Sequence, residues 1–323
     1  MYRHFHWGLS VIAICLLAAG CKKDLLYWQH VQQLNTHTTS RLDNIRFLGN
    51  NICVIAGGVQ FSTAEVLRSA DGGYTWQNHA YPQAGKEMTG MSVTSLGHIY
   101  LCGADGTVLY SADSGLSFGF NRIGSWATLT GGTFATPDTG IFVSTVLQRN
   151  SAITRIDSAY HIINTDSFDF GMNNMYMADM NNGYIVGYGA VMKTVNRGNS
   201  WMFLDPTDDN FTAMDIHGDE IWMCGANGSV YHTINAGYHW DRYRNGNDIA
   251  LPRYGLRCIL FKDELNGWAA GDGGVMIHSN DGGKHWAQYS SFTGSTIRSM
   301  ALCPNGDLLA AGDDGTLFRL SGL

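Results

Sequence analysis

Three arginines are the residues whose type and setting most favour binding chemistry in this chain. Arg46, Arg257 and Arg298 each follow an isoleucine or leucine in a short apolar stretch, and we expect them at matching positions of three repeated units, the first, sixth and seventh. A guanidinium group presents a planar fork of N–H donors that fits a carboxylate. If the three groups meet, they would bind a carboxylate or an acidic peptide segment. The alternative is that each arginine pairs with a neighbouring aspartate.

Carboxylates could act as general acids, but most of them occur in a repeated turn. The copies are SADGGYTW (69–76), SADSGLSF (111–118), TVNRGNSW (194–201), TINAGYHW (233–240) and SNDGGKHW (279–286). Their third positions are Asp71, Asp113, Asn196, Asn235 and Asp281. An asparagine keeps a hydrogen-bond acceptor for the turn, whereas it could not replace a general acid or a charged metal ligand. These side chains are therefore predicted to be structural.

Histidine and cysteine give no convincing metal or redox site. His232 and His239 flank one turn and His278 and His285 flank another, but duplication of a repeat produces such spacing, and no third ligand accompanies either pair. Of the seven cysteines, Cys15 and Cys21 lie near the N-terminus, which leaves an odd number, without a CxxC motif. We expect buried thiols, no metal and no cofactor.

The repeated turns require strands around them. Each turn follows a short apolar run, places Gly at its fifth position and closes on an aromatic residue that begins a return strand, which is the pattern of a tight hairpin. Copies recur about every 40 residues, a period typical of propeller blades. The aromatic positions are Trp28, Trp76, Phe118, a weak place near Tyr160, Trp201, Trp240 and Trp286. Their rings should pack between neighbouring sheets.

The two ends of the chain complement each other. The segment Ile297–Leu320 supplies three strands but no fourth, whereas Tyr27 and Trp28 open a strand with no first three before it. Pairing the N-terminal strand with the last unit would close a ring and leave no unit incomplete. The sequence therefore predicts an all-β fold, a seven-bladed β-propeller of four-stranded blades, closed by the N-terminal strand.

The first 20 residues have the pattern of a secretion signal. A short polar head precedes an apolar run from Leu9 to Ala19, which is too short to be a permanent membrane span. The residues before Cys21 resemble a bacterial lipobox, although Leu17 lies four residues before the cysteine rather than three. Residues 1–20 are thus predicted to be a lipoprotein signal peptide and Cys21 the lipidated residue. No Asp follows Cys21, which favours the outer membrane, with the periplasmic or surface side left open.

Composition agrees with a single globular domain over residues 21–323. The net charge of −7 and the lack of a basic run exclude an electrostatic basis for nucleic-acid binding. Trp126 lies outside the repeated turns and is the candidate for an exposed aromatic contact, with a buried position as the alternative. We expect a monomer.

The repeated turns resemble the Asp-box, or bacterial neuraminidase repeat, and the strands around them resemble propellers of the photosystem II stability and assembly factor family. The resemblance covers nearly the whole mature chain. It implies a non-catalytic assembly factor with an arginine patch on one face. Asp-box propellers also include sialidases, but the Arg-Ile-Pro segment that usually marks a sialidase is missing, since RLDNIRF (41–47) contains no Pro.

The function predicted from these features is a lipid-anchored, non-catalytic scaffold of the cell envelope. It would bind a protein or acidic peptide partner, with Arg46, Arg257, Arg298 and Trp126 as the candidate contacts, and could assist assembly of a membrane complex. The alternative is a surface propeller that binds or cleaves glycans. Convergent carboxylates beside an aromatic platform would favour the sugar, and an arginine-rich channel mouth would favour the peptide.

Overall fold

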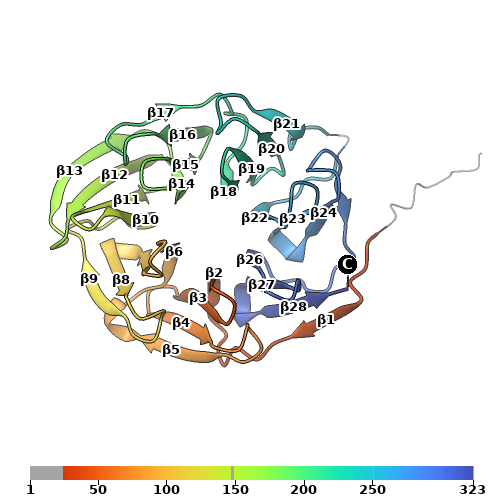
Figure 1. Cartoon of the computed structure of the whole chain (residues 1–323), viewed down its shortest axis with the longest axis horizontal. Helices are drawn as coiled ribbons and strands as arrows, with labels where there is room; N and C mark the ends of the chain where they lie inside the picture. Colours follow the sequence, from red (N-terminus) through yellow and green to blue (C-terminus); the bar gives the residue numbers. More distant parts are fainter. Residues whose placement is uncertain (1–24, 147–148, 250, 323) are drawn as a thin grey trace, which may run out of the picture.

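The chain folds into a ring of blades. The computed structural model describes residues 25–146, 149–249 and 251–322. Within these residues the strands form seven antiparallel sheets of four strands each, arranged around a central opening (Figure 1). The predicted all-β seven-bladed propeller is confirmed. No helix in the described part of the chain has the length and apolar character needed to span a bilayer.

The first four blades follow the chain in order. Blade 1 contains β2 (Arg41–Leu48), β3 (Ile52–Val59), β4 (Thr63–Ser69) and β5 (Gln77–Tyr81). Blade 2 contains β6 (Met88–Val93), β7 (Ile99–Gly103), β8 (Thr107–Ser111) and β9 (Gly119–Arg122). Blade 3 contains β10 (Thr128–Thr136), β11 (Thr139–Val146), β12 (Asn150–Asp157) and β13 (Ile162–Phe168). Blade 4 contains β14 (Met172–Met177), β15 (Gly183–Gly187), β16 (Ala190–Thr194) and β17 (Met202–Phe203).

The last blade takes one strand from the N-terminus. Blade 5 contains β18 (Phe211–His217), β19 (Glu220–Gly225), β20 (Val230–Thr233) and β21 (Asp241–Arg244). Blade 6 contains β22 (Leu256–Phe261), β23 (Gly267–Gly271), β24 (Met276–Ser279) and β25 (Ala287–Gln288). Blade 7 contains β26 (Ile297–Leu302), β27 (Leu308–Gly312), β28 (Leu317–Ser321) and β1 (His30–Gln33). Short 3-10 turns are η1 (Pro82–Ala84), η2 (Ala104–Gly106), η3 (Asp272–Gly274) and η4 (Asp313–Gly315).

The ring closes where the two ends of the chain meet. Strand β1 pairs antiparallel with β28, with Val31 opposite Leu320, and the two strands lie side by side in Figure 1. Just before β1, the Trp28 ring stacks on Tyr289 of the preceding blade, with centroids 4.5 Å apart. The predicted closure by the N-terminal strand is therefore confirmed.

The repeated turns are held by their third residue. In the first copy, Ser69 Oγ donates to Asp71 Oδ1 (2.7 Å), and the Thr75 hydroxyl donates to Oδ2 (2.6 Å). The backbone N–H groups of Tyr74 and Thr75 also donate to this carboxylate. Asn196 plays the same part in blade 4, where its Oδ1 accepts from the Thr194 hydroxyl and the Ser200 N–H. The side chain acts as an acceptor that fixes the turn.

These hydrogen bonds lower the pKa of three aspartates. At Asp71 and Asp281 burial acts to raise the pKa, but hydrogen bonds, from Thr75 and His285 first, bring it down to about 2. At Asp113 the Ser117 hydroxyl is the largest cause of a pKa of about 2. The folded-state pKa thus lies below the ordinary value of 3.8. Such carboxylates contribute stability above about pH 4 that is lost as the pH falls towards 2.

Replacing all three aspartates by asparagine should reduce the loss of stability at acid pH. The triple variant D71N/D113N/D281N keeps the acceptor that Asn196 already provides, so it should fold, and its unfolding free energy should fall less than that of the wild type between pH 4 and pH 2. Urea denaturation at several pH values measures the effect. D241N, at an exposed position on β21, should keep the wild-type slope. Equal slopes in the triple variant and the wild type would contradict the assignment.

One position on the third strand links neighbouring blades. Its partner on the second strand lies three residues before Gly57, Gly103, Ser144, Gly187, Gly225, Gly271 or Gly312. The occupants of this position are Arg68, Tyr110, Arg155, Lys193, His232, His278 and Arg319. Four of them donate to a backbone carbonyl in the repeated turn of the next blade. The pairs are Arg68 to Ser114, Arg155 to Gly198, Lys193 to Ala236 and Arg319 to Gly72. We call these four contacts the blade latches.

Blade 3 lacks the repeated turn and closes its last hairpin with a different aspartate turn. Asp157 accepts from the N–H groups of Ala159 and His161, and so closes the hairpin between β12 and β13. Tyr160 has a positive φ of 65° and packs edge-on against Phe134, 5.5 Å between centroids. The weak aromatic position predicted near Tyr160 is thus occupied by that ring.

Candidate functional site

The central channel is formed by the first strand of every blade. It encloses a cavity of about 790 Å³, lined by residues of β2, β6, β10, β14, β18, β22 and β26. Every one of these strands has a register shift after its first or second residue, for example between Leu42 and Asn44. A β-bulge of this kind re-aims one side chain. The bulged residues, which we call the bulge ring, are Asp43, Thr89, Thr130, Asn173, Thr212, Arg257 and Arg298.

The bulge corrects the predicted alignment of the three arginines. Arg257 and Arg298 lie in the bulge ring, but blade 1 places Asp43 there and Arg46 three residues further along β2. All three arginines line the channel. The prediction that they occupy matching positions was wrong for Arg46, because an aliphatic residue before an arginine occurs both at the bulge and beyond it.

The two arginines of the bulge ring are paired with aspartates. Arg257 donates from Nε and Nη2 to the two carboxylate oxygens of Asp272, at 2.8 and 3.0 Å. Arg298 makes the equivalent fork with Asp313 and lies 3.8 Å from Asp43. The hydrogen bond to Asp272 raises the pKa of Arg257. For these two arginines the structure supports the alternative of local pairing over an open cationic patch.

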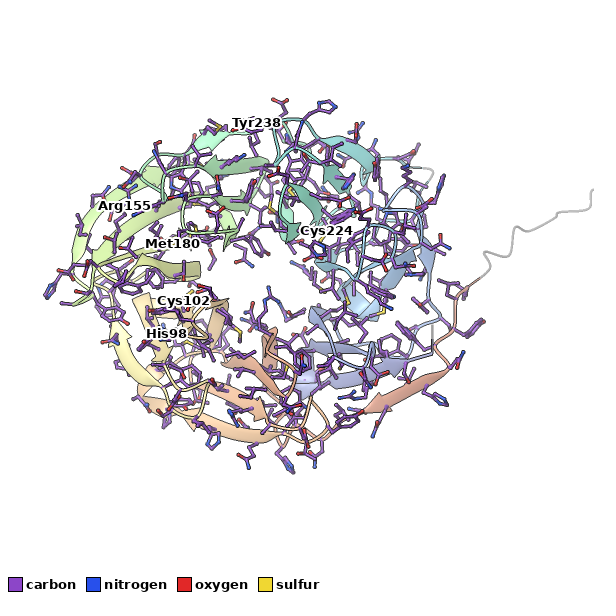
Figure 2. The ribbon with its side chains drawn as sticks, viewed as in Figure 1. His98, Cys102, Arg155, Met180, Cys224 and Tyr238 are labelled. Atoms are coloured by element: carbon purple, nitrogen blue, oxygen red, sulfur yellow. The ribbon has the colours of Figure 1, made fainter. Side chains whose placement is uncertain are left out.

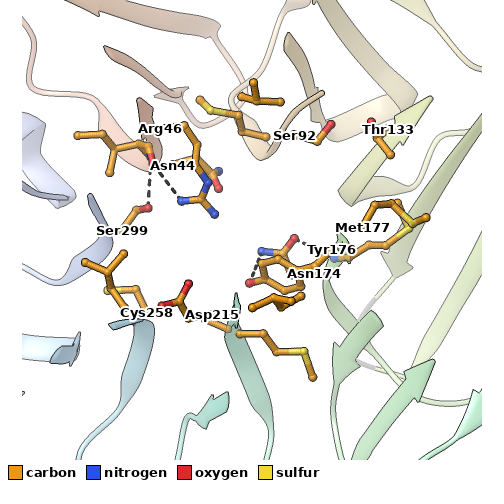
Figure 3. Close-up of a pocket in the computed structure, with 18 of the residues that line it drawn as sticks. Asn44, Arg46, Ser92, Thr133, Asn174, Tyr176, Met177, Asp215, Cys258 and Ser299 are labelled. Atoms are coloured by element: carbon orange, nitrogen blue, oxygen red, sulfur yellow. Dashed lines mark hydrogen bonds between the residues drawn. The ribbon is translucent and has the colours of Figure 1, made fainter. Parts of the chain in front are cut away.

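Arg46 belongs to a second ring of channel residues. Equivalent positions, three beyond each bulge, are Arg46, Ser92, Thr133, Tyr176, Asp215, Leu260 and Ala301, which we call the waist ring. The Arg46 side chain reaches into the channel and donates from Nη1 to the carbonyl of Ile45 at 3.0 Å (Figure 3). Among the described residues no carboxylate lies within 4.0 Å of its guanidinium, since Arg46 occurs in none of the ion pairs. It is therefore the channel arginine available to a ligand.

Tyr176 and Asp215 also project into the channel, on the side away from Arg46 (Figure 3). The Tyr176 hydroxyl accepts from Asn174 Nδ2 at 3.0 Å. Burial raises the pKa of this phenol to about 12, with a smaller opposing effect of Arg46, so the hydroxyl keeps its proton at neutral pH. Asp215 Oδ2 accepts from the Phe261 N–H (2.6 Å) and from His217 Nε2 (3.1 Å).

Sequence reasoning missed Tyr176 and Asp215. Neither lies in a repeated turn, and neither resembles the arginine segments. Tyr176 and Asp215 pair with second-strand residues that lie three before a glycine, Gly187 and Gly225 respectively. Aligning the blades on this glycine would have placed both residues at the position of Arg46. That alignment requires the bulge, which the sequence does not mark.

The other predicted site residues lie apart from the channel. Trp126 is 83% exposed and is not among the residues that line the cavity, so the predicted contact residues are not all brought together. Residues 1–20 and Cys21 lie outside the described residues. The five remaining cysteines are free and buried, and Cys102 and Cys224 have equivalent places on β7 and β19 (Figure 2).

The histidine pairs are divided between interior and surface. His232 stacks on Trp222 and hydrogen-bonds Glu220, and His278 stacks on Trp268. His239 and His285 are exposed beside the repeated turns. In the part of the chain that the structure describes, no group of three or more His, Cys, Asp or Glu could hold a metal ion.

Sequence comparison finds that part of this propeller is similar to a known family. Residues 157–252, from the end of β12 into the segment before β22, match the model PSII_BNR, "Photosynthesis system II assembly factor YCF48". This segment resembles that family. It contains the two asparagine turns, of blades 4 and 5. The predicted resemblance to photosystem II assembly factors is therefore supported. No curated protein sequence matches the chain.

Solved structures with this fold include YCF48 proteins and an enzyme. YCF48 from Cyanidioschyzon merolae is 20% identical, with a TM-score of 0.65 over 90% of this chain and 98% of that one. A structure of YCF48 bound to D1 peptide is 16% identical, with a TM-score of 0.69 over 93% of this chain and 100% of that one. A streptogramin B lyase is 12% identical, with a TM-score of 0.70 over 90% and 97%. At these identities the likeness concerns the fold, which hosts both binding proteins and enzymes.

Proposed function

We propose that the protein is a lipid-anchored, non-catalytic scaffold of the cell envelope that binds a protein or peptide partner in its central channel. The observation that carries the proposal is Arg46, whose guanidinium points into a cavity of about 790 Å³ and has no carboxylate partner among the described residues. A cation held there in part-buried surroundings favours a ligand that brings a carboxylate. The segment that resembles the YCF48 family and the YCF48 structure bound to D1 peptide add support.

The described carboxylates that line the channel are each engaged by neighbouring donors or cations. Asp43 accepts from Arg41 at 2.8 Å and lies near Arg298. Asp179 accepts from the N–H groups of Asn181 and Asn182 at a hairpin tip, and Asp215 is held by His217 and Phe261. Hydrolysis of a glycoside needs two acids facing each other across the bond. This arrangement supports binding over the alternative of a glycan-cleaving propeller.

Replacing Arg46 by glutamine tests the proposed binding site. The variant keeps a polar side chain but removes the charge, so envelope partners captured by the wild type should be largely lost, whereas R122Q, on the outer strand β9, should retain them. R257Q and R298Q should have smaller effects, because Asp272 and Asp313 already occupy those guanidinium groups. Quantitative mass spectrometry after affinity capture measures each variant. An unchanged partner profile for R46Q would rule out the channel as the binding site.

The proposed lipid anchor depends on Cys21, outside the described residues. Replacing Cys21 by serine removes the thiol that would carry the lipid, and the mature protein should then move from the membrane pellet to the soluble fraction. Fractionation with metabolic labelling by a fatty-acid analogue checks both location and acylation. Membrane association of the variant without acylation would exclude a lipid anchor at this residue. We propose the outer membrane as the location of the anchored protein.

A further inference from the structure

The waist ring carries a positive and a negative group on different sides of one channel. Arg46 comes from β2 in blade 1 and Asp215 from β18 in blade 5, and two blades separate them along the shorter way round the ring. Figure 3 shows both side chains directed into the cavity from different sides. Within the described residues these two groups form no ion pair with each other. A ligand in the channel would therefore meet a cation at one end and a carboxylate at the other.

Both groups retain unused hydrogen-bonding capacity. Asp215 Oδ2 receives the donors of Phe261 and His217, whereas Oδ1 accepts no hydrogen bond from any described residue. Arg46 uses Nη1 for the Ile45 carbonyl, and its Nε and Nη2 have no acceptor in the part of the chain that the structure describes. Tyr176 accepts from Asn174, and its own O–H has no acceptor among the described residues. The Asp215 side chain is 19% exposed, so its carboxylate is partly desolvated.

The rest of the channel lining mixes polar side chains, such as Ser92 and Thr133, with methionines. The methionines that line the channel are Met91, Met175, Met177, Met180, Met214 and Met300. Thioether side chains rearrange easily and accept apolar groups of varied shape. A ligand with charged ends, polar peptide groups and a small apolar side chain between them fits this lining.

We propose that the waist of the channel binds a short peptide with free termini, whose carboxylate is held by Arg46 and whose ammonium group is held by Asp215. The inference rests on the channel being the binding site of the proposed function, and it adds the requirement for a cation on the ligand. An extended residue spans about 3.3–3.6 Å, so a tripeptide, about 10 Å long, is the ligand chosen for the test.

The experiment uses the full chain and the peptide Ala-Leu-Ala with free termini. Isothermal titration calorimetry compares it with the N-acetylated and the C-amidated forms. Each cap should weaken binding to the wild type at least about tenfold, because it leaves one buried charge without a partner. In R46M, amidation of the C-terminus should not weaken binding further, because the partner of the carboxylate is already missing. In D215N, acetylation of the N-terminus should likewise not weaken binding further. R122M and D241N, at exposed positions on β9 and β21, should behave as the wild type.

The outcomes separate this inference from the proposed function. Equal binding of the capped and free peptides, or no binding of Ala-Leu-Ala, would overturn the two-ended site. If R46Q still loses the envelope partner in that case, the scaffold proposal stands and its ligand carries only a carboxylate. Circular dichroism melting of R46M and D215N checks that both variants are folded; Asn at position 215 can still accept from Phe261.

Discussion

Replacing Arg319 by alanine is expected to lower the free energy of unfolding by about 3 kcal/mol, the usual result when one partner of a buried pair is removed. Arg319 is 5% exposed and forms the blade latch that joins blade 7 to blade 1. Its guanidinium donates to Asp307 at 2.9 Å and to the Gly72 carbonyl at 2.8 Å, and it lies 3.8 Å from the Tyr74 ring centroid. The alanine variant leaves both acceptors without this cation at the junction where the ring closes.

Arg242 provides a matched control for this latch. It also pairs with an aspartate, Asp208, at 2.6 Å, but its side chain is 44% exposed. Water screens such a pair, so R242A should cost less than about 1 kcal/mol. Urea denaturation of both variants gives the comparison. Similar losses for R319A and R242A would show that the latch does not stabilise the closure.

Replacing Gly271 by alanine is the second substitution with a large expected effect. A Cβ at this position would lie 1.8 Å from the Gly255 carbonyl oxygen and 2.9 Å from Leu256 Cα. The clash is with backbone, so the linker before β22 would have to move, at a cost of at least about 3 kcal/mol. The same close approach occurs at Gly57 and Gly312, beside the bulges of blades 1 and 7. These glycines allow the linker to pass against the end of the second strand.

Gly294 serves as the control for Gly271. It has no positive φ, and nothing lies within 4 Å of a Cβ built on it, so G294A should be neutral or slightly stabilising. Chemical denaturation of the two variants distinguishes a steric requirement from a general cost of replacing glycine. G271A should also disturb Arg257, the bulged residue next to Leu256. Wild-type stability of G271A would contradict the packing of this linker.

Much of the architecture could be predicted because its signals are local. The hydrogen bonds of the repeated turn join residues two to four positions apart, as from Thr75 to Asp71, so a short stretch of sequence specifies the hairpin. The incomplete last unit and the unpaired strand around Trp28 identified the closure for the same reason. Blade 3 was the weakest prediction. There Asp157 closes the hairpin and Tyr160 supplies the aromatic ring, without the residue pattern of the repeated turn.

The sequence alone determined the number of blades, the turns and the pairing of β1 with β28. The tertiary structure decided which charges are free. A one-residue bulge sets Arg257 and Arg298 beside Asp272 and Asp313, and it places Arg46 at the level of Tyr176 and Asp215. Tyr176 and Asp215 lie on other blades than Arg46 and are more than a hundred residues from it in the chain. Their proximity depends on the closed ring and the bulge register, neither of which a local pattern of residue types encodes.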